Sequence, residues 1–261
     1  MVQRTEKSRF PQKTTEDYRL EEEELANNGS RRAPIVVCVD CSFSMRKKNR
    51  VQEKSRLQGM MEGLNGFCQD MNRDPLARDS VELCLISFGG EHACVECDFA
   101  TPDRITLPEL VADGGTPLAD AVELAVENLE ERKRRYEDNG ISFYRPWLVI
   151  IGDGVETGSF KQLEETARKL KEESENKRLN VLCIVVGSED KVRQESSSLM
   201  RLSPDGKVQY LRDLKFREFF SWLSRSIQKT SQSMSGEEVY YEPTEDWAEI
   251  LSQDGGELHD V

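Results

Sequence analysis

Three short segments of the chain carry oxygen-bearing side chains at spacings that could hold a metal ion. The first is a D-x-S-x-S pattern over residues 40–44, in which every second residue offers a carboxylate or a hydroxyl. The second is a Gly-Gly-Thr sequence ending at residue 116, and the third is the Gly-Asp-Gly sequence 152–154. Sets made only of oxygen ligands suit hard cations, and sites that keep several waters suit Mg²⁺. The candidate metal ligands are therefore Asp40, Ser42, Ser44, Thr116 and Asp153.

Each segment, taken alone, also has an ordinary structural explanation. Asp40 could simply end a strand, and a serine after it could cap the next helix. Thr116 stands directly before Pro117, where an N-cap residue belongs. Asp153 followed by glycine is typical of a turn. The prediction of a shared site depends on all three segments occurring in this order at the ends of predicted strands.

The surrounding pattern alternates between buried strands and amphipathic helices. Continuous apolar runs predict strands at 35–39, 81–88, 147–151 and 180–186, with a short strand at 208–211. Helical spacing of apolar residues occurs in 57–71, 117–135, 159–175 and 215–228. A Gly-Gly pair at 89–90 predicts a hairpin to one antiparallel edge strand at 93–99. We therefore expect a doubly wound, Rossmann-like α/β fold with a mostly parallel sheet, in which ligands bind outside the carboxyl ends of the strands.

With its metal-binding pattern, the sequence resembles the von Willebrand factor A (VWA) domain and its metal-ion-dependent adhesion site. The resemblance covers residues 33–232, and within the family the chain looks closest to the bacterial TerY/YegL-like branch. The segments that carry it are RRAPIVVCVDCSFSM, VELCLISFGG, DGGTPLADAVELA, RPWLVIIGDG and FREFFSWLSRSIQKTSQSMS. The usual D-T-S-G-S is D-C-S-F-S here, and the usual T-D-G is G-D-G, but none of these departures removes an expected ligand. We expect Phe43, which replaces the usual glycine, to form an apolar wall beside the metal.

The resemblance implies a function and a set of residue roles. Ser42 and Ser44 would bind the ion directly, Thr116 directly or through water, and Asp40 and Asp153 largely through waters. The ion would be Mg²⁺, with Mn²⁺ or Ca²⁺ as alternatives, and the carboxylate of a partner protein would complete its coordination. The implied setting is a bacterial stress-response or tellurium-resistance-type signalling system, in which a kinase or phosphatase could be the partner.

Two other classes of function compete with this interpretation. One is a metal-assisted hydrolase or phosphotransfer enzyme, but the chain has neither a P-loop nor a G-x-S-x-G motif, and of its two histidines His259 lies near the C-terminus. We therefore do not expect an enzyme. The other is a structural scaffold whose metal site is closed by the chain's own acidic tail. The candidate ligands are Glu242, Glu245, Asp246 and Glu249, together with acidic residues of the N-terminal extension.

The remaining sequence divides into a charged N-terminal extension, 1–32, and an acidic C-terminal tail, 233–261, on either side of the predicted domain, 33–232. A short helix is expected around residues 16–26. The aromatic and aliphatic residues within the tail favour its docking on its own domain or on a partner.

Composition excludes several partners and locations. A formal charge of −13 argues against nucleic acid and against an anionic membrane surface. The first residues lack the apolar stretch of a secretory signal. Seven cysteines, an odd number, mostly within apolar runs, favour reduced thiols in the cytoplasm. Cys94 and Cys97 lie near His92 and could form a three-ligand metal site, although structural zinc usually has four ligands.

Overall fold

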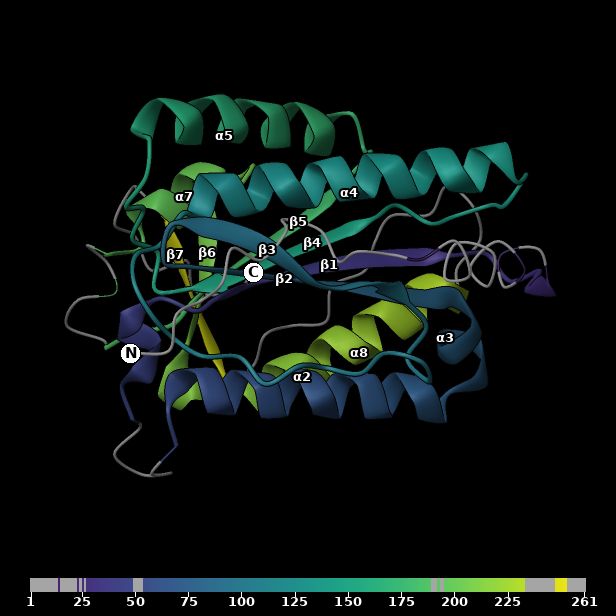
Figure 1. Cartoon of the computed structure of the whole chain (residues 1–261), viewed down its shortest axis with the longest axis horizontal. Helices are drawn as coiled ribbons and strands as arrows, with labels where there is room; N and C mark the ends of the chain where they lie inside the picture. The colour runs from purple at the N-terminus through teal and green to yellow at the C-terminus, as the bar shows by residue number, and fades with distance from the viewer. Residues whose placement is uncertain are drawn as a thin grey trace.

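The computed structural model describes residues 14, 23, 25, 27–48, 54–188, 192, 195–232 and 247–252. Their centre is a seven-stranded sheet in the order β3-β2-β1-β4-β5-β6-β7 (Figure 1). The strands are β1 (Ala33–Asp40), β2 (Val81–Gly89), β3 (His92–Ala100), β4 (Trp147–Gly152), β5 (Asn180–Val185), β6 (Lys207–Leu211) and β7 (Ala248–Ser252). The predicted α/β class and mostly parallel sheet are confirmed.

The parallel strands β2, β1, β4, β5 and β6 place their carboxyl ends at one rim of the sheet, at the left in Figure 1. Strand β1 lies near the middle, paired with β2 on one side and β4 on the other. All eight of its residues are buried, as its continuous apolar run predicts. The loops after β1 and β4 therefore emerge side by side.

Helices cover both faces of the sheet (Figure 1). One face carries α4 (Leu118–Asp138), α5 (Phe160–Glu175) and α7 (Ser197–Leu202). The other carries α2 (Arg56–Arg73), α3 (Pro75–Ser80) and α8 (Phe216–Gln232). Two short 3₁₀ helices, η1 (Phe43–Arg46) and η2 (Arg212–Leu214), follow β1 and β6. The sheet thus separates two hydrophobic cores, one on each face.

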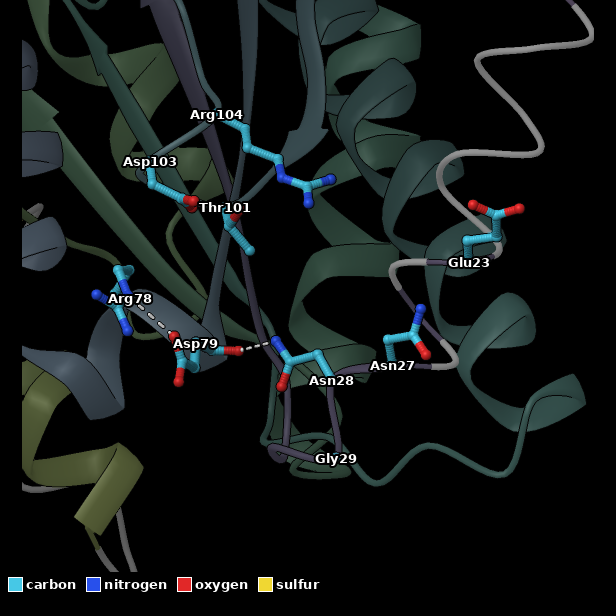
Figure 2. Close-up of a pocket in the computed structure, with 9 residues that line it drawn as sticks. All are labelled: Glu23, Asn27, Asn28, Gly29, Arg78, Asp79, Thr101, Asp103 and Arg104. Atoms are coloured by element: carbon cyan, nitrogen blue, oxygen red, sulfur yellow. Dashed lines mark hydrogen bonds and ion pairs between the residues drawn. The ribbon is translucent and has the colours of Figure 1, made fainter.

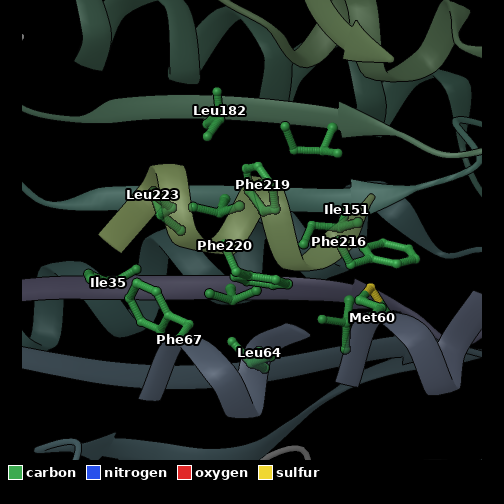
Figure 3. Close-up of a cluster of buried hydrophobic side chains, with 14 of the residues drawn as sticks. Ile35, Met60, Leu64, Phe67, Ile151, Leu182, Phe216, Phe219, Phe220 and Leu223 are labelled. Carbon is green, nitrogen blue, oxygen red and sulfur yellow. The ribbon is translucent and has the colours of Figure 1, made fainter. Parts of the chain in front are cut away.

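The core between α2, α8 and the sheet is rich in phenylalanine (Figure 3). The rings of Phe219 and Phe220 lie 4.8 Å apart between centroids, and Phe67 of α2 lies 6.1 Å from Phe220. The aromatic stripe of α8 therefore serves packing, which fixes α8 against both α2 and the sheet.

The sheet has a second antiparallel edge strand in addition to the predicted one. Strand β7 lies within the segment that the sequence analysis treats as tail, and it pairs with β6 from Lys207↔Ser252 to Leu211↔Ala248. Its anchor is Trp247, which is 7% exposed and lies against Phe219 and Trp222. Part of the tail thus docks on its own domain, which is one of the two expected arrangements.

Two residues of the predicted N-terminal extension are also buried. Leu25 is 3% exposed, and Arg32 has no exposed surface and lies 3.4 Å from the Glu82 carboxylate. Residues 23, 25 and 27 are helical, whereas most of the expected helix around 16–26 lies outside the described residues.

None of the seven cysteines forms a disulfide, and five of them are buried. Among the described parts of the chain, no helix combines the length and apolar character needed to cross a membrane.

Candidate metal centre

Neighbouring strands bring the first and third candidate segments together. Asp40 is the last residue of β1, and Asp153 follows the last residue of β4. Because β1 and β4 are parallel and paired, their ends lie at the same rim. After β1 the chain turns into η1, which brings Ser44 to the end of β4, where its hydroxyl contacts Asp153.

Four of the five predicted ligands contact one another directly. The Ser42 N–H donates to Asp40 Oδ1 at 2.7 Å, and the Asp153 N–H donates to Asp40 Oδ2 at 3.3 Å. Ser42 Oγ and Ser44 Oγ lie 3.0 Å apart, and the Ser44 hydroxyl donates to Asp153 Oδ2. The result is a compact group of two carboxylates and two hydroxyls, all from residues that the spacing in the sequence predicts as metal ligands.

Gly152 makes the close approach of the two aspartate loops possible. A Cβ atom at this position would lie 2.9 Å from Asp40 Oδ2 and 3.1 Å from Asp40 Cβ. Any side chain there would push Asp40 away from its present position. The departure from the usual T-D-G sequence therefore has a direct structural consequence, because it leaves room for the Asp40 carboxylate.

The loop that carries Thr116 packs against the D-x-S-x-S loop through backbone hydrogen bonds. The Asp113 N–H donates to the Cys41 carbonyl at 2.7 Å, and the Phe43 N–H donates to the Gly114 carbonyl at 3.1 Å. Gly114 has a φ of +68°, a conformation that favours glycine. These contacts come from Asp113 and Gly114; Thr116 follows Gly114 by two positions and is 5% exposed.

Two residues of the loop that follows Asp153 hold the segment around Thr116 in place: Thr157 contacts Thr116 itself, and Glu156 contacts the start of α4. Neither was predicted from the sequence. The Thr116 N–H donates to Thr157 Oγ1 at 2.6 Å, and the Thr157 N–H returns a bond to the Thr116 carbonyl at 3.1 Å. The Glu156 carboxylate accepts the Ala119 N–H at 2.8 Å in the first turn of α4. The sequence signal was weak, because an ordinary G-V-E-T sequence gives no indication that it will contact a loop about 40 positions earlier.

Burial gives the Asp40 carboxyl an unusual protonation equilibrium. Loss of hydration, together with repulsion from Asp153, raises the pKa of Asp40 to about 6. Hydrogen bonds from Ser42 and Asp153 act in the opposite direction but do not offset burial. A divalent cation would relieve this repulsion, so the oxygen-only donor set and its charge both fit a hard metal ion.

Comparison with known proteins agrees with this architecture. The family model of the von Willebrand factor type A domain matches residues 35–155, the span that contains all five predicted ligands. This chain contains a von Willebrand factor type A domain. Domains of this family commonly mediate protein–protein interactions. No curated protein matches the chain.

Several solved structures share the fold of this VWA domain. The von Willebrand factor domain of the type V pili tip protein Mfa5 from Porphyromonas gingivalis has a TM-score of 0.54 and 10% identity, covering 80% of this chain and 99% of that one. The pilus adhesin SpaC from Lactobacillus rhamnosus GG has a TM-score of 0.56 and 14% identity, and the match covers 76% of this chain and 30% of SpaC. The minor pilin PilB from Streptococcus sanguinis has a TM-score of 0.53 and 11% identity, and the match covers 80% of this chain and 64% of PilB. At these identities the likeness concerns the fold alone.

Other candidate metal sites receive no support from the described residues. Within them, no group of three or more His, Cys, Asp or Glu side chains could hold a metal ion. This leaves the proposed His92, Cys94 and Cys97 set without the required geometry, and the Cys97 thiol instead donates to the Thr106 carbonyl at 3.3 Å. The five-residue centre is of a different kind, since it combines only two carboxylates with three hydroxyls.

Glu249 does not cap the metal centre as the tail hypothesis allowed. It belongs to β7 and lies 3.4 Å from the Arg212 guanidinium. Three strand spacings separate β7 from β4, a distance of about 14 Å. The other three tail candidates, Glu242, Glu245 and Asp246, lie outside the described residues.

A pocket of about 490 Å³ lies at the opposite end of the sheet from the metal centre (Figure 2). It is lined by residues 27–29, the end of α3 and the turn after β3. Asn28 donates to the Asp79 carbonyl at 2.8 Å, and Arg78 pairs with the Asp79 carboxylate at 3.0 Å. Its lining mixes both signs of charge, so it favours no single class of ligand.

Proposed function

We propose that this VWA domain is a metal-dependent protein-interaction module. A Mg²⁺ ion held by Asp40, Ser42, Ser44, Thr116 and Asp153 would accept the carboxylate of a partner protein, with Mn²⁺ or Ca²⁺ as alternative ions. The observation that carries the proposal is the contact group itself, in which two buried carboxylates and two hydroxyls converge at the carboxyl end of β1 and β4. Uncharged hydroxyl ligands would leave the cation electrophilic, which favours binding of an incoming carboxylate.

We propose that the module acts by binding rather than by chemical turnover. The carboxylates and hydroxyls of the centre hydrogen-bond one another, whereas His92 begins the edge strand β3, two strands away from β1. Turnover of generic phosphoesters by the Mg²⁺-loaded chain, lost in Asp40→Ala, would contradict this proposal.

The setting that the resemblance implies completes the proposal. We place the chain in a bacterial stress-response or tellurium-resistance-type signalling system, with a kinase or phosphatase as a candidate partner. Seven cysteines that form no disulfide, five of them buried, support a cytoplasmic location.

Affinity capture with the full chain tests the interaction directly. Cell extract is passed over the immobilised wild-type chain in Mg²⁺ and in EDTA, and over Ser42→Ala/Ser44→Ala in Mg²⁺. Ser142→Ala is the matched control, because Ser142 is an exposed serine between α4 and β4, at the opposite end of the sheet. We expect the wild-type chain and the Ser142→Ala control to retain partner proteins in Mg²⁺, and the wild-type chain to lose them in EDTA. Retention of the same proteins in EDTA and by the double variant would contradict the proposal.

A further inference from the structure

Large exposed apolar side chains concentrate around the metal centre. Among the described residues five such side chains are exposed, and Leu76, on α3, lies at the opposite end of the sheet. The other four lie on loops or a helix start at the rim where the strands end: Phe43, Val111, Val155 and Phe160. Scattered exposed apolar residues are normal on a protein surface. Four of five around one site therefore indicate a docking surface, which we call the apolar rim.

Two members of the rim adjoin the metal ligands directly. Phe43 stands between Ser42 and Ser44 in the sequence and is 61% exposed. The Val155 N–H donates to Asp153 Oδ1 at 3.4 Å, which ties Val155 to the second carboxylate of the centre. Both loops of the centre therefore carry an exposed apolar side chain within two residues of a predicted ligand.

Charge next to Phe43 is positive, although the chain as a whole carries −13. Arg46, Lys47 and Lys48 are consecutive and exposed. The Arg46 guanidinium lies 5.0 Å from the centre of the Phe43 ring and 3.4 Å from the Asp113 carboxylate. This cluster complements an acidic ligand and would attract it toward the rim.

We infer that the partner presents an aspartate or glutamate flanked by bulky apolar residues, within an acidic segment. The carboxylate would address the metal centre, the apolar neighbours would cover Phe43 and Val155, and further acidic residues would face the basic cluster. This inference rests on the proposed function and adds to it the chemistry by which the partner is selected. Apolar contacts around a polar anchor exclude water from it, which is how a single charged contact gains specificity.

Selection from a library of short random peptides with one fixed aspartate tests the inference on the full chain. Selections are run in Mg²⁺ and in EDTA, and the recovered peptides are measured by fluorescence polarisation. Binding is compared between wild type, Phe43→Ser, Val155→Ser and the control Leu76→Ser, which removes an exposed apolar side chain far from the rim. We expect enrichment of Leu, Ile, Phe or Trp next to the aspartate, and about tenfold weaker binding to each rim variant but not to the control.

The outcomes separate the two proposals. Peptides selected in Mg²⁺ without apolar enrichment, no enrichment at all, or peptides that bind the rim variants as tightly as wild type would overturn the inference while leaving the metal site intact. Peptides selected equally in EDTA would overturn the proposed function itself.

Discussion

Asp40 has no exposed surface, yet it lies beside a second carboxylate, Asp153, and accepts two backbone hydrogen bonds. A sequence that only needed to end a strand would gain nothing from burying two like charges together. At the residue scale, this arrangement is explained if a cation offsets the charge. Two predictions follow from individual contacts of the centre.

The first concerns the pH dependence of stability in EDTA. The native pKa of Asp40, about 6, lies above its value in the unfolded chain, so the native state binds the proton more tightly. The stabilisation is therefore fully present below about pH 4 and is lost as the pH rises through about 6, by up to about 3 kcal/mol. Urea unfolding of wild type and Asp40→Asn across this range should show a smaller decline for the variant. An identical decline would contradict the assignment.

The second concerns Thr157, which holds Thr116 through its hydroxyl. Thr157→Val removes the acceptor for the Thr116 N–H, a loss of about 1 kcal/mol. We expect Mg²⁺ affinity, measured by calorimetry, to fall about fivefold to tenfold with the fold retained. Thr157→Ser keeps the oxygen and should retain wild-type affinity. Equal affinity for all three proteins would mean that Thr116 needs no such support.

At the element scale, the helix pair α2 and α8 offers a matched pair of glycine substitutions. A Cβ at Gly63 would lie 2.7 Å from Phe220 and 3.2 Å from the backbone of Phe216, whereas a Cβ at Gly66 would meet nothing within 4 Å. Gly63→Ala should destabilise the fold by about 1–3 kcal/mol because α8 must shift. Gly66→Ala should stabilise it by about 0.5–1 kcal/mol because alanine favours the helix. Thermal unfolding of both variants measures the two changes in stability. Changes of the same sign in Gly63→Ala and Gly66→Ala would contradict this packing.

The elements that the sequence predicted are those with strong periodicity. Continuous apolar runs gave β1, β4 and β5, and helical spacing gave α2, α4, α5 and α8. Strand β7 was missed because its five residues, Ala-Glu-Ile-Leu-Ser, lie within an acidic tail and become a strand only by pairing with β6. The short helices α3 and α7 were missed because six residues are too few to show a period.

In the candidate site, too, the residues with a visible sequence pattern could be predicted and those without one could not. The D-x-S-x-S loop and Asp153 could be predicted because their spacing and their places after strands are visible in the sequence. The supporting contacts of Thr157 and Glu156 could not, because they depend on how two distant loops approach one another. The room that Gly152 leaves for Asp40 likewise became visible only in three dimensions.

At the scale of the whole molecule, the metal centre and the C-terminal strand lie on different parts of the sheet. Trp247 closes the core beside β7, with ring centroids 5.5 Å from Trp222 and 5.7 Å from Phe219. Trp247→Ala should therefore cost about 3 kcal/mol in unfolding free energy, while Mg²⁺ affinity of the folded protein stays unchanged.

Denaturant unfolding and Mg²⁺ titration of the same sample test this separation. Glu249→Ala is the control within the same strand, since its ion pair with Arg212 is partly exposed and should contribute less than about 1 kcal/mol. A loss of Mg²⁺ affinity in Trp247→Ala would show that the far edge of the sheet does shape the metal centre.

The central claim is that Asp40, Ser42, Ser44, Thr116 and Asp153 form a metal site, and calorimetric titration of Mg²⁺ into the EDTA-treated and dialysed full chain tests it most directly. The account predicts saturable binding at one site in wild type and in Ser142→Ala, lost in Ser42→Ala/Ser44→Ala, with the folded state of each protein checked by circular dichroism. Absence of binding in the folded wild type, or equal binding by the folded double variant, would contradict the account.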